Sequence, residues 1–465
     1  MSPELLSREA VPTPPAEYDE SLDRARRVVE ALFGPADDRP FGVRYWNGSE
    51  DLPGNRSDAR FTLWFRRPGA LRRMLLPPSE LSITEAYIAG DVELLGDAEK
   101  AMHLGDAIGS RIQSIGGFAA LLPQLIALPR DEYADGFRAA RHSRFSRRGH
   151  SPMRMEGGQD AIQHHYDAGN EFYGLWLDER MVYSCAYFRD PDESLASAQL
   201  NKLDLICRKL RLEPGMRLLD IGCGWGALIM HAAANYGVRA TGITLSVAQA
   251  ALARDRIDAA GLAEKCRVEL RDYRELTNEE EFDRVASVGM MEHVGDGRLP
   301  GYFSLAHRVL RPGGLFINHA IVRDGRRPDP TATDRILSRL WKRGEFINRH
   351  VFPDGRLVPV AQVVDRAERA GFELRDVEAM REHYIITLRH WLRRLEHRRE
   401  EAVELAGERR YRTWRLYILA AINGFRAGNT NIVQALFAKC ASDGAVPLPL
   451  TRDYLGIQTT RRTAH

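Results

Sequence analysis

The strongest chemical signal in this sequence is a glycine-rich turn. An apolar run leads into Asp220, after which Gly222, Gly224 and Gly226 alternate with other residues. Glycine adopts the left-handed backbone of tight turns and lets a ligand approach the main chain closely. When such a turn joins a buried strand to a helix, the helix N-terminus can hold part of a nucleotide-like ligand. The turn therefore predicts a cofactor pocket.

Two kinds of cofactor fit this spacing. The glycines also satisfy the loose dinucleotide fingerprint, which needs an acidic residue about 20 residues later for a ribose hydroxyl. The next predicted strand ends at Thr244 without a carboxylate. Asp220 can accept a hydrogen bond from the ammonium group of a cationic ligand, and Thr244 and Gln249 offer neutral hydrogen-bonding groups. The pattern D-x-G-x-G-x-G thus favours S-adenosylmethionine over a nicotinamide dinucleotide.

A second candidate for chemistry is Glu292. It follows the buried run 285–291 at the carboxyl end of a predicted strand, where open α/β sheets bind their ligands. Cys185, His319 and Tyr384 each stand alone on apolar segments, where such residues usually belong to the core. The residues themselves give no reason to expect these three to meet Glu292.

The elements that position these residues alternate between strands and helices. Strands are predicted over 216–221, 238–245, 266–270, 282–290 and 315–322, and helices over 197–210, 227–236, 247–260, 300–310 and 360–370. Helices of this length between strands imply parallel βαβ units, hence a doubly wound α/β sheet. A further Arg-rich helix is expected over 384–417. The polar segment 323–349 interrupts the alternation and is a candidate lid.

The chain divides into five predicted segments. They are a mobile Pro-rich tail (1–20), a smaller N-terminal α+β domain (21–135), a basic linker (136–158), a catalytic domain (159–440) and a C-terminal tail (441–465). Residues 137–154 carry six arginines and no acidic residue. This run is either a solvated linker or a patch that docks on an anionic membrane surface.

Composition narrows the class of protein. The 66 Lys and Arg against 64 Asp and Glu give a net charge of +2, so we expect no nucleic-acid partner. The 44% hydrophobic and 28% charged residues are typical of a folded soluble chain. Five widely spaced cysteines form no C-x-x-C pair, which predicts no metal site and fits a reducing cytoplasm. The N-terminus lacks the pattern of a signal peptide.

Several motifs together resemble a known family. They are the Asp220–Gly226 turn, Thr244-Leu245-Ser246 with Gln249, His165-Tyr166-Asp167-x-Gly169-Asn170, Tyr183 to Phe188, Gly289 to Gly295, and Phe352-Pro353-x-Gly355. The set, over about 162–437, resembles the cyclopropane-fatty-acyl-phospholipid synthases, which are related to the mycolic acid cyclopropane synthases. The preceding α+β domain looks like the N-terminal domain of the phospholipid-acting members.

The resemblance implies a function. It implies a Rossmann-like class I methyltransferase sheet with helical additions. The enzyme would transfer a methylene unit from S-adenosyl-L-methionine to the double bond of an unsaturated phospholipid acyl chain, forming a cyclopropane ring. By resemblance, the residues around the methyl donor are Tyr183, Ser184, Asp220, Gly222, Gly224, Gly226, Thr244, Gln249, Asp272 and Tyr273. The substrate lies in a membrane, so the resemblance places the protein at the cytoplasmic face, docked peripherally.

The resemblance also assigns the reacting centre. Cys185, Glu292, His319 and Tyr384, with the backbone at Ile321, match family positions that hold a bicarbonate ion beside the alkene. The base is then bicarbonate or Glu292 itself, and Tyr166 or Phe425 would stabilise a cation. Ala421 stands where many relatives have a cysteine, which excludes a covalent cysteine nucleophile there.

Alternatives stay open. The same fold can make methyl- or methylene-branched acyl chains. A methyltransferase for a small soluble metabolite would leave the N-terminal domain without a use. A non-catalytic lipid-binding protein would leave the glycine turn without a use. The sequence does not decide the oligomeric state, and a homodimer is one possibility.

Overall fold

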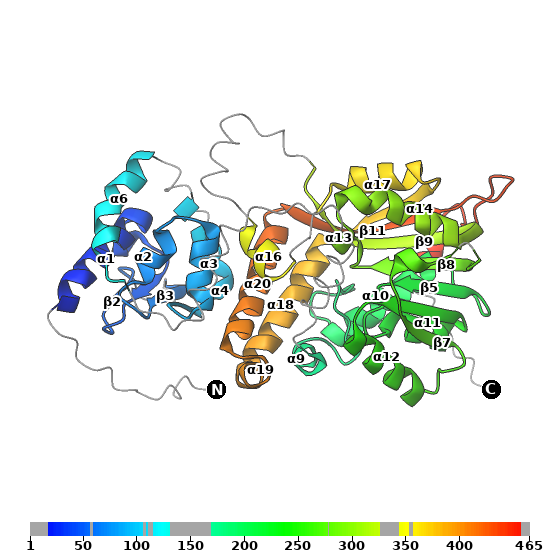
Figure 1. Ribbon diagram of the computed structural model, residues 1–465, viewed down its shortest axis with the longest axis horizontal. Coiled ribbons are helices and arrows are strands. Elements are labelled where there is room, and N and C mark those ends of the chain that lie inside the picture. Colours follow the sequence, from blue (N-terminus) through cyan, green and yellow to red (C-terminus); the bar gives the residue numbers. More distant parts are fainter. Residues whose placement is uncertain are drawn as a thin grey trace. The chain divides into compact units, whose positions relative to one another are not determined.

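The computed structural model divides into two compact units. It describes residues 17–55, 59–105, 108–109, 115–130, 169–277, 279–325, 344–352 and 357–456 (Figure 1). The first unit comprises Met1–Arg154, Asp329–His350 and Arg412–Leu419, and the second Met155–Pro328, Val351–Tyr411 and Ala420–His465. Of the described residues, 344–350 and 412–419 group with the first unit, although the predicted catalytic domain spans 159–440.

The second unit is built on a seven-stranded sheet within the described residues, with strand order β10-β11-β9-β8-β5-β6-β7. The strands are β5 (Arg217–Ile221), β6 (Arg239–Thr244), β7 (Cys266–Leu270), β8 (Phe282–Val288), β9 (Leu310–Arg323), β10 (Glu373–Ala379) and β11 (Thr430–Ala438). Strands β5 to β9 pair in parallel. β11 runs antiparallel to both β9 and β10. The predicted doubly wound α/β sheet is therefore confirmed.

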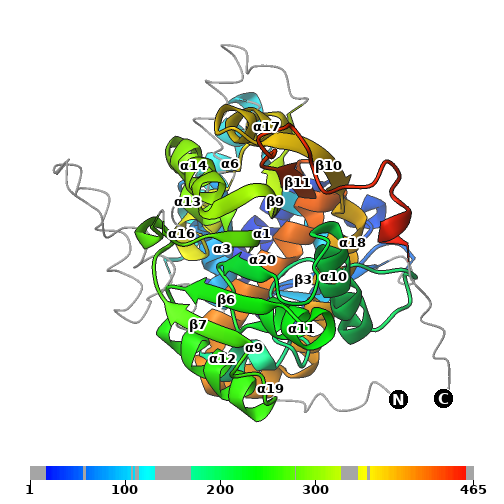
Figure 2. The ribbon, with the colours of Figure 1, turned by 90° about the vertical axis from the view of Figure 1, so that its right-hand side faces the viewer.

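Helices cover both faces of this sheet. They are α10 (Leu195–Lys209), α11 (Ala227–Tyr236), α12 (Val247–Ala259), α14 (Leu299–Val309) and α17 (Val360–Arg369). Alternate strand residues enter opposite cores: Leu219 packs with α14 and α17, whereas Leu218 packs with α10, α11 and α12. The two groups of helices lie on the two sides of the strands in Figure 2. This burial of both strand faces explains the continuous apolar runs in the sequence.

Most predicted elements are confirmed, and the exceptions are local. The segment 384–417 is helical as predicted, and it is divided among α18 (Arg381–His397), α19 (Arg399–Ala406) and α20 (Glu408–Arg426). Gly407 separates the last two with a φ of 81°, a conformation that glycine adopts without strain. Strands β10 and β11 were not predicted. The first helix, α1 (Glu17–Phe33), begins inside the predicted tail.

The first unit is the expected smaller α+β domain. Its sheet has the order β2-β1-β3-β4 within the described residues. The elements are β1 (Gly42–Arg44), β2 (Glu50–Asp51), β3 (Phe61–Phe65), β4 (Val92–Gly96), α2 (Ala70–Leu75), α3 (Glu80–Ile88), α4 (Ala98–Ala101) and α6 (Ile115–Ala127). One apolar core, which includes Val43, Phe65 and Leu71, joins the sheet to its helices.

Later parts of the chain complete this first unit. Glu80 at the start of α3 accepts hydrogen bonds from the backbone N–H groups of Gly344 (2.6 Å) and Phe346 (3.4 Å), which lie at α16 (Glu345–His350). From α20, the Arg412 guanidinium donates to the Tyr87 carbonyl (3.1 Å) and Arg415 donates to the Tyr87 hydroxyl (2.7 Å). The unit is thus assembled from segments far apart in the sequence.

Some predictions fall outside the described residues. These are the basic linker with its six arginines, most of the N-terminal tail, the motif residues 165–168, Pro353 and Gly355, and residues 326–343 of the candidate lid. In the part of the chain that is described, no helix is long and apolar enough to cross a membrane.

Candidate active site

A pocket opens at the carboxyl ends of the parallel strands of the second unit. Its space, including the solvent at its mouth, is about 980 Å³. The predicted donor residues that line it are Tyr183, Ser184, Asp220, Gly222, Gly224, Thr244, Gln249 and Tyr273. Gly226 and Asp272 were predicted to surround the donor and do not line the pocket. The structure thus brings together eight of the ten predicted donor residues.

The glycine turn forms one wall of the pocket and depends on backbone geometry. Gly222, Gly224 and Gly226 all have positive φ values, of 83°, 54° and 82°. A Cβ on Gly224 would meet nothing within 4 Å, so this residue leaves its space to the pocket. Gly226 instead forms the N-cap of α11, which explains its absence from the pocket wall.

The turn lies tightly against β6. The backbone N–H groups of Gly222 and Cys223 both donate to the Ile243 carbonyl at 3.0 Å. A Cβ on Gly242 would lie 2.7 Å from both Cβ and Sγ of Cys223, closer than atoms can pack. Gly242 is therefore a further glycine that the turn requires, and sequence analysis did not single it out.

Polar groups from β6 and β7 reach the pocket in different ways. The Thr244 hydroxyl lies 2.8 Å from Oε1 of Gln249, so these two predicted ribose-side residues form one unit. Asp272 caps a short helical turn and forms an ion pair with Arg274 at 2.6 Å. This pairing directs the Asp272 carboxylate to Arg274, while the adjacent Tyr273 lines the pocket.

Asp220 and Lys202 are both buried in the pocket wall, and the charge of each favours the ionised form of the other. Asp220 is 2% exposed, and its Oδ1 has no hydrogen-bond partner among the described residues. Burial raises the pKa of Asp220 to about 7, against the opposing effect of Lys202. Lys202 is also buried, and its Nζ donates to Oγ of Ser184 at 2.8 Å. Sequence analysis missed Lys202, although its position four residues before Ile206 places it on the apolar face of the predicted helix.

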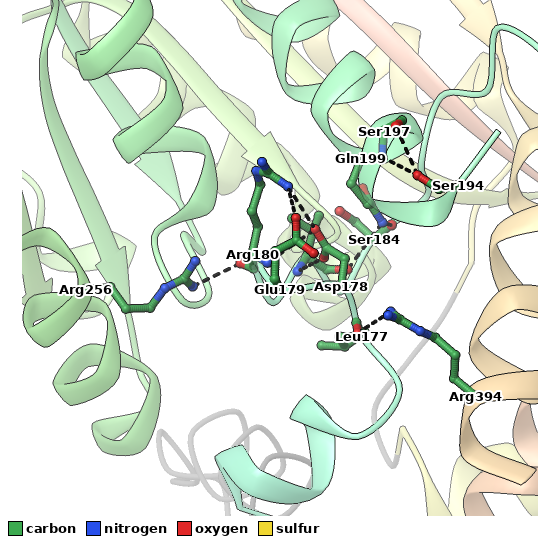
Figure 3. Close-up of polar contacts among 11 residues, drawn as sticks. Leu177, Asp178, Glu179, Arg180, Ser184, Ser194, Ser197, Gln199, Arg256 and Arg394 are labelled. Carbon is green, nitrogen blue, oxygen red and sulfur yellow. Dashed lines mark hydrogen bonds and ion pairs between the residues drawn. The ribbon is translucent and has the colours of Figure 1, made fainter. Parts of the chain in front are cut away.

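A short loop carries Tyr183 and Ser184, which both line the pocket. Figure 3 shows Ser184 together with Leu177, Asp178, Glu179 and Arg180 of this loop. Within the loop, Asp178 accepts hydrogen bonds from the N–H groups of Val182 (2.9 Å) and Arg180 (3.3 Å). Met181, which also lines the pocket, has a φ of 57°, an unusual conformation for a side-chain-bearing residue. Local hydrogen bonds thus hold a strained backbone in place.

Two arginines fix this loop from outside. The Arg256 guanidinium, on α12, donates to the carbonyl of Arg180 (3.0 Å) and to that of Trp225 in the glycine turn (3.2 Å). Arg394, on α18, donates to the Leu177 carbonyl at 2.5 Å. Figure 3 shows both side chains reaching the loop from separate helices. Arg256 therefore connects two walls of the pocket.

Glu292 is held beside the predicted donor pocket. It lies on α13 (Met291–Val294), between Met290 and His293, which both line the pocket. Its Oε1 accepts a hydrogen bond from the Ile321 N–H at 2.6 Å, and its buried Oε2 has no partner among the described residues. Burial raises the pKa of Glu292 to about 7. The Ile321 amide therefore binds Glu292, whereas the resemblance expected it to bind a separate anion.

His319 lies on β9, two residues before Ile321. It is fully buried, and its Nδ1 is 3.0 Å from Nε2 of Gln434 on β11, the residue opposite it in the strand pair. Its Nε2 has no partner among the described residues. Burial lowers the pKa of His319 well below its usual value, so the ring is neutral at pH 7.

Cys185 and Tyr384 both lie next to the Met380 carbonyl at the start of α18. The Cys185 thiol lies 3.8 Å from the Met380 carbonyl, which also accepts the Tyr384 N–H at 3.1 Å. The Met380 N–H donates to the carbonyl of Ile432, which pairs with Ile321 across β11 and β9. The pairing of β9 with β11 thus connects Met380, beside Cys185 and Tyr384, to Ile321, which binds Glu292. Burial raises the pKa of the Cys185 thiol, which is neutral at pH 7.

These four residues offer groups of the kind that hold a small anion. Cys185, His319 and Tyr384 are neutral side chains that can donate hydrogen bonds, and Glu292 can do so when protonated. The buried Oε2 of Glu292 and Nε2 of His319 both lack a partner among the described residues. The Tyr384 ring lies 4.8 Å from that of Phe425, so one predicted cation-stabilising aromatic is in this group. The other, Tyr166, is outside the described residues.

Comparisons with known proteins agree with this geometry. Residues 154–435 match the family model described as mycolic acid cyclopropane synthetase, and residues 28–105 match a domain of unknown function. A probable fatty acid methyltransferase of Pseudomonas putida is 37% identical over 417 residues, 89% of this chain and 95% of that protein. The cyclopropane-fatty-acyl-phospholipid synthase of Escherichia coli K12 is 37% identical over 280 residues, 60% of this chain and 68% of that enzyme.

Solved structures give the same result. The mycolic acid cyclopropane synthase CmaA1, complexed with S-adenosylhomocysteine (SAH) and CTAB, aligns with a TM-score of 0.56 and 33% identity, over 62% of this chain and 99% of that one. MmaA2 of Mycobacterium tuberculosis aligns with a TM-score of 0.55 and 34% identity, over 60% and 98%. The chain therefore belongs to the mycolic acid cyclopropane synthetase family of S-adenosylmethionine-dependent methyltransferases.

Proposed function

We propose that this enzyme transfers a methylene unit from S-adenosylmethionine to the double bond of an unsaturated phospholipid acyl chain, forming a cyclopropane ring. One observation carries the proposal. The strand ends that form the donor pocket also hold a buried carboxyl, Glu292, with an unpartnered Oε2. Ring closure at a carbocation held away from water needs a proton acceptor within the site, and the carboxyl of Glu292 can serve as one.

The reaction follows from the weak nucleophilicity of an alkene. The pocket must hold the π-bond in line with the methyl–sulfur bond and away from water. The π electrons form a bond to the methyl carbon, the carbon–sulfur bond breaks, and S-adenosylhomocysteine leaves. A carbocation remains on the acyl chain. Loss of a proton from the new methyl group releases the electron pair that closes the ring.

The proton needs an acceptor within the site. We infer that Glu292 accepts it through Oε2, since its pKa of about 7 suits a group that exchanges protons near neutral pH. Cys185, Glu292, His319 and Tyr384 are the side chains that would hold a bicarbonate ion. When bound there, bicarbonate would supply a second proton acceptor beside the acyl chain.

A second outcome for the cation is supported by the comparisons. The Pseudomonas putida relative is named a probable fatty acid methyltransferase, as is a Mycobacterium tuberculosis relative that is 34% identical over 439 residues. In this alternative a hydride shifts from the methylated carbon to the neighbouring cationic carbon, and loss of a proton from the new methyl group then leaves a methylene branch. A hydride from a separate donor would instead leave a methyl branch. A small soluble metabolite as acceptor is a weaker alternative.

We further propose that the enzyme works on the cytoplasmic face of a membrane. The acyl double bond lies within a bilayer, so the protein must dock there and draw a chain into its site. All five cysteines are free, as a reducing compartment requires. The arginines of residues 137–154 would supply attraction to anionic lipid, which added salt would weaken.

The test uses the full chain with labelled S-adenosylmethionine and vesicles of unsaturated phospholipid. We expect fatty acids that gain one CH₂ and take up no hydrogen on mild catalytic hydrogenation, which marks a ring. A product that takes up hydrogen identifies a methylene branch, and a saturated chain that gains CH₄ overall identifies a methyl branch. Donor binding without any labelled fatty acid would overturn the lipid assignment.

Glu292→Gln separates binding from chemistry in the same assay. We expect S-adenosylhomocysteine to bind normally while turnover falls at least about a hundredfold, as for loss of general base catalysis. The matched control is Glu400→Gln, a change to an exposed side chain on α19, and it should keep wild-type turnover. Wild-type turnover in Glu292→Gln would remove this carboxyl from the mechanism.

A further inference from the structure

A buried lysine lines the donor pocket, where a cationic ligand is expected. Lys202 is 2% exposed, in the middle of α10, and it lines the pocket together with Ser184 and Asp220. Its ammonium group donates to Oγ of Ser184 at 2.8 Å. Burying an ammonium group is costly unless nearby groups compensate for its lost hydration. We therefore expect the buried ammonium group of Lys202 to have a role in the pocket.

Among the acidic groups that act on Lys202, Asp220 has an oxygen without a hydrogen-bond partner among the described residues. Asp178 and Asp220 both favour the charged form of Lys202, and burial lowers the pKa of the lysine to about 8. Asp178 already accepts hydrogen bonds from two backbone N–H groups, those of Arg180 and Val182. Asp220 has no such partner at Oδ1. Lys202 is thus the charge that favours the ionised form of Asp220.

The pocket wall also carries Arg271 and His293, and the His293 ring is neutral because burial lowers its pKa to about 4. Three further titratable groups interact with the charge of Asp220 and are neutral at pH 7. They are the thiols of Cys207 and Cys223 and the hydroxyl of Tyr302, and burial raises the pKa of each. Cys185, which adjoins Lys202, is also a neutral thiol because burial raises its pKa. Among the described residues, Lys202 is therefore the cation that acts on the Asp220 carboxyl.

We propose that Lys202 is a positioning residue for the methyl donor: its ammonium group holds Ser184 at 2.8 Å and shares the pocket wall with Asp220, so that Oδ1 of Asp220 can accept a hydrogen bond from the donor's ammonium group. This role rests on the assignment of the pocket to S-adenosylmethionine. A protonated Asp220 would offer the ammonium group no charge. Lys202 thus acts on the donor through Asp220.

The proposal predicts a particular pH dependence. Donor binding requires ionised Asp220, so affinity falls as pH falls through the pKa of Asp220. Without the lysine cation, burial acts unopposed and that pKa rises. The loss of affinity in a Lys202 variant should therefore be large near neutral pH and should shrink at higher pH, where the carboxyl ionises without help.

The test is calorimetric titration of the full chain with S-adenosylhomocysteine, between about pH 6 and about pH 8.5. This ligand carries the ammonium group but lacks the sulfonium charge. For Lys202→Met we expect affinity to fall roughly tenfold at pH 7 and less than about threefold at pH 8.5. An equal loss at every pH would mean a merely structural role, and unchanged or tighter binding at pH 7 would equally overturn the proposal.

Two further variants complete the design. Lys209→Met removes another buried lysine of α10, one that forms an ion pair with Glu378 at 2.5 Å and does not line the pocket. It should keep the wild-type affinity profile. Asp220→Asn, in a background with Lys202 intact, should bind weakly with no pH dependence, which tests the idea even if Lys202→Met fails to fold. A wild-type chain that binds no ligand at any pH would refute the donor assignment itself.

Discussion

Replacing Glu292 with glutamine should make the protein more stable while it destroys turnover. Burial raises the pKa of this carboxyl from 4.5 to about 7 in the folded chain. Each pH unit between the two values corresponds to about 1.4 kcal/mol, so the whole interval amounts to about 3 kcal/mol of the free energy of unfolding. Glutamine keeps the shape of the side chain and carries no ionisable proton.

The sign follows from the binding of protons. The folded state binds the Glu292 proton more tightly than the unfolded state, because its pKa is higher. This contribution to stability is complete below about pH 4.5 and is lost as pH rises to about 7. Above that pH, the wild type must bury an ionised carboxylate and the variant need not.

Urea unfolding at about pH 5 and at about pH 8, followed by tryptophan fluorescence, measures this difference. We expect the advantage of Glu292→Gln to grow by up to about 3 kcal/mol between the two conditions. Glu400→Gln, which is exposed, should show no such growth. Parallel pH dependence in Glu292→Gln and wild type would refute the reasoning, because it would mean that burial does not penalise the charge of this carboxylate.

Three other variants probe the donor pocket. Gly224→Val places a branched side chain at a φ of 54° in space left for the ligand, so affinity for S-adenosylhomocysteine should fall at least about tenfold in calorimetry; normal affinity would reject the turn assignment. Gly242→Ala should lower the free energy of unfolding by about 1–3 kcal/mol, since its Cβ would lie 2.7 Å from Cys223; a neutral urea midpoint would contradict this. Arg256→Met removes two hydrogen bonds to loop carbonyls and should weaken ligand binding about tenfold, with faster amide exchange at Met181; unchanged exchange there would show that Arg256 does not hold the loop.

Local signals in the sequence predicted the donor side of the site. Hydrophobic periodicity and glycine spacing are properties of neighbouring residues, so α11 and β7 were predicted with the bounds observed. Asp220 was found because it lies at the end of a recognisable buried strand, and Glu292 because it follows one. Gly242 was missed because its need for a small side chain comes from Cys223, on a different strand connection.

The environment of the reacting centre could not be predicted in the same way. The contact between His319 and Gln434 depends on the register of β9 and β11, which lie far apart in the sequence. The occupation of the Ile321 amide by Glu292 depends on the turn after β8. Family resemblance supplied the list of residues, and only the folded sheet shows which of them touch.

The use of α20 by both units has a consequence for synthesis on the ribosome. Residues 412–419 belong to the first unit, and Arg412 and Arg415 hydrogen-bond to Tyr87 near its centre. The N-terminal unit cannot complete these contacts while the nascent chain ends before α20. Until then the Tyr87 hydroxyl lacks its Arg415 partner, while the Tyr87 carbonyl keeps the hydrogen bond from the Gly90 N–H at 3.0 Å. Folding of the N-terminal unit is therefore completed late in translation, although it is begun first.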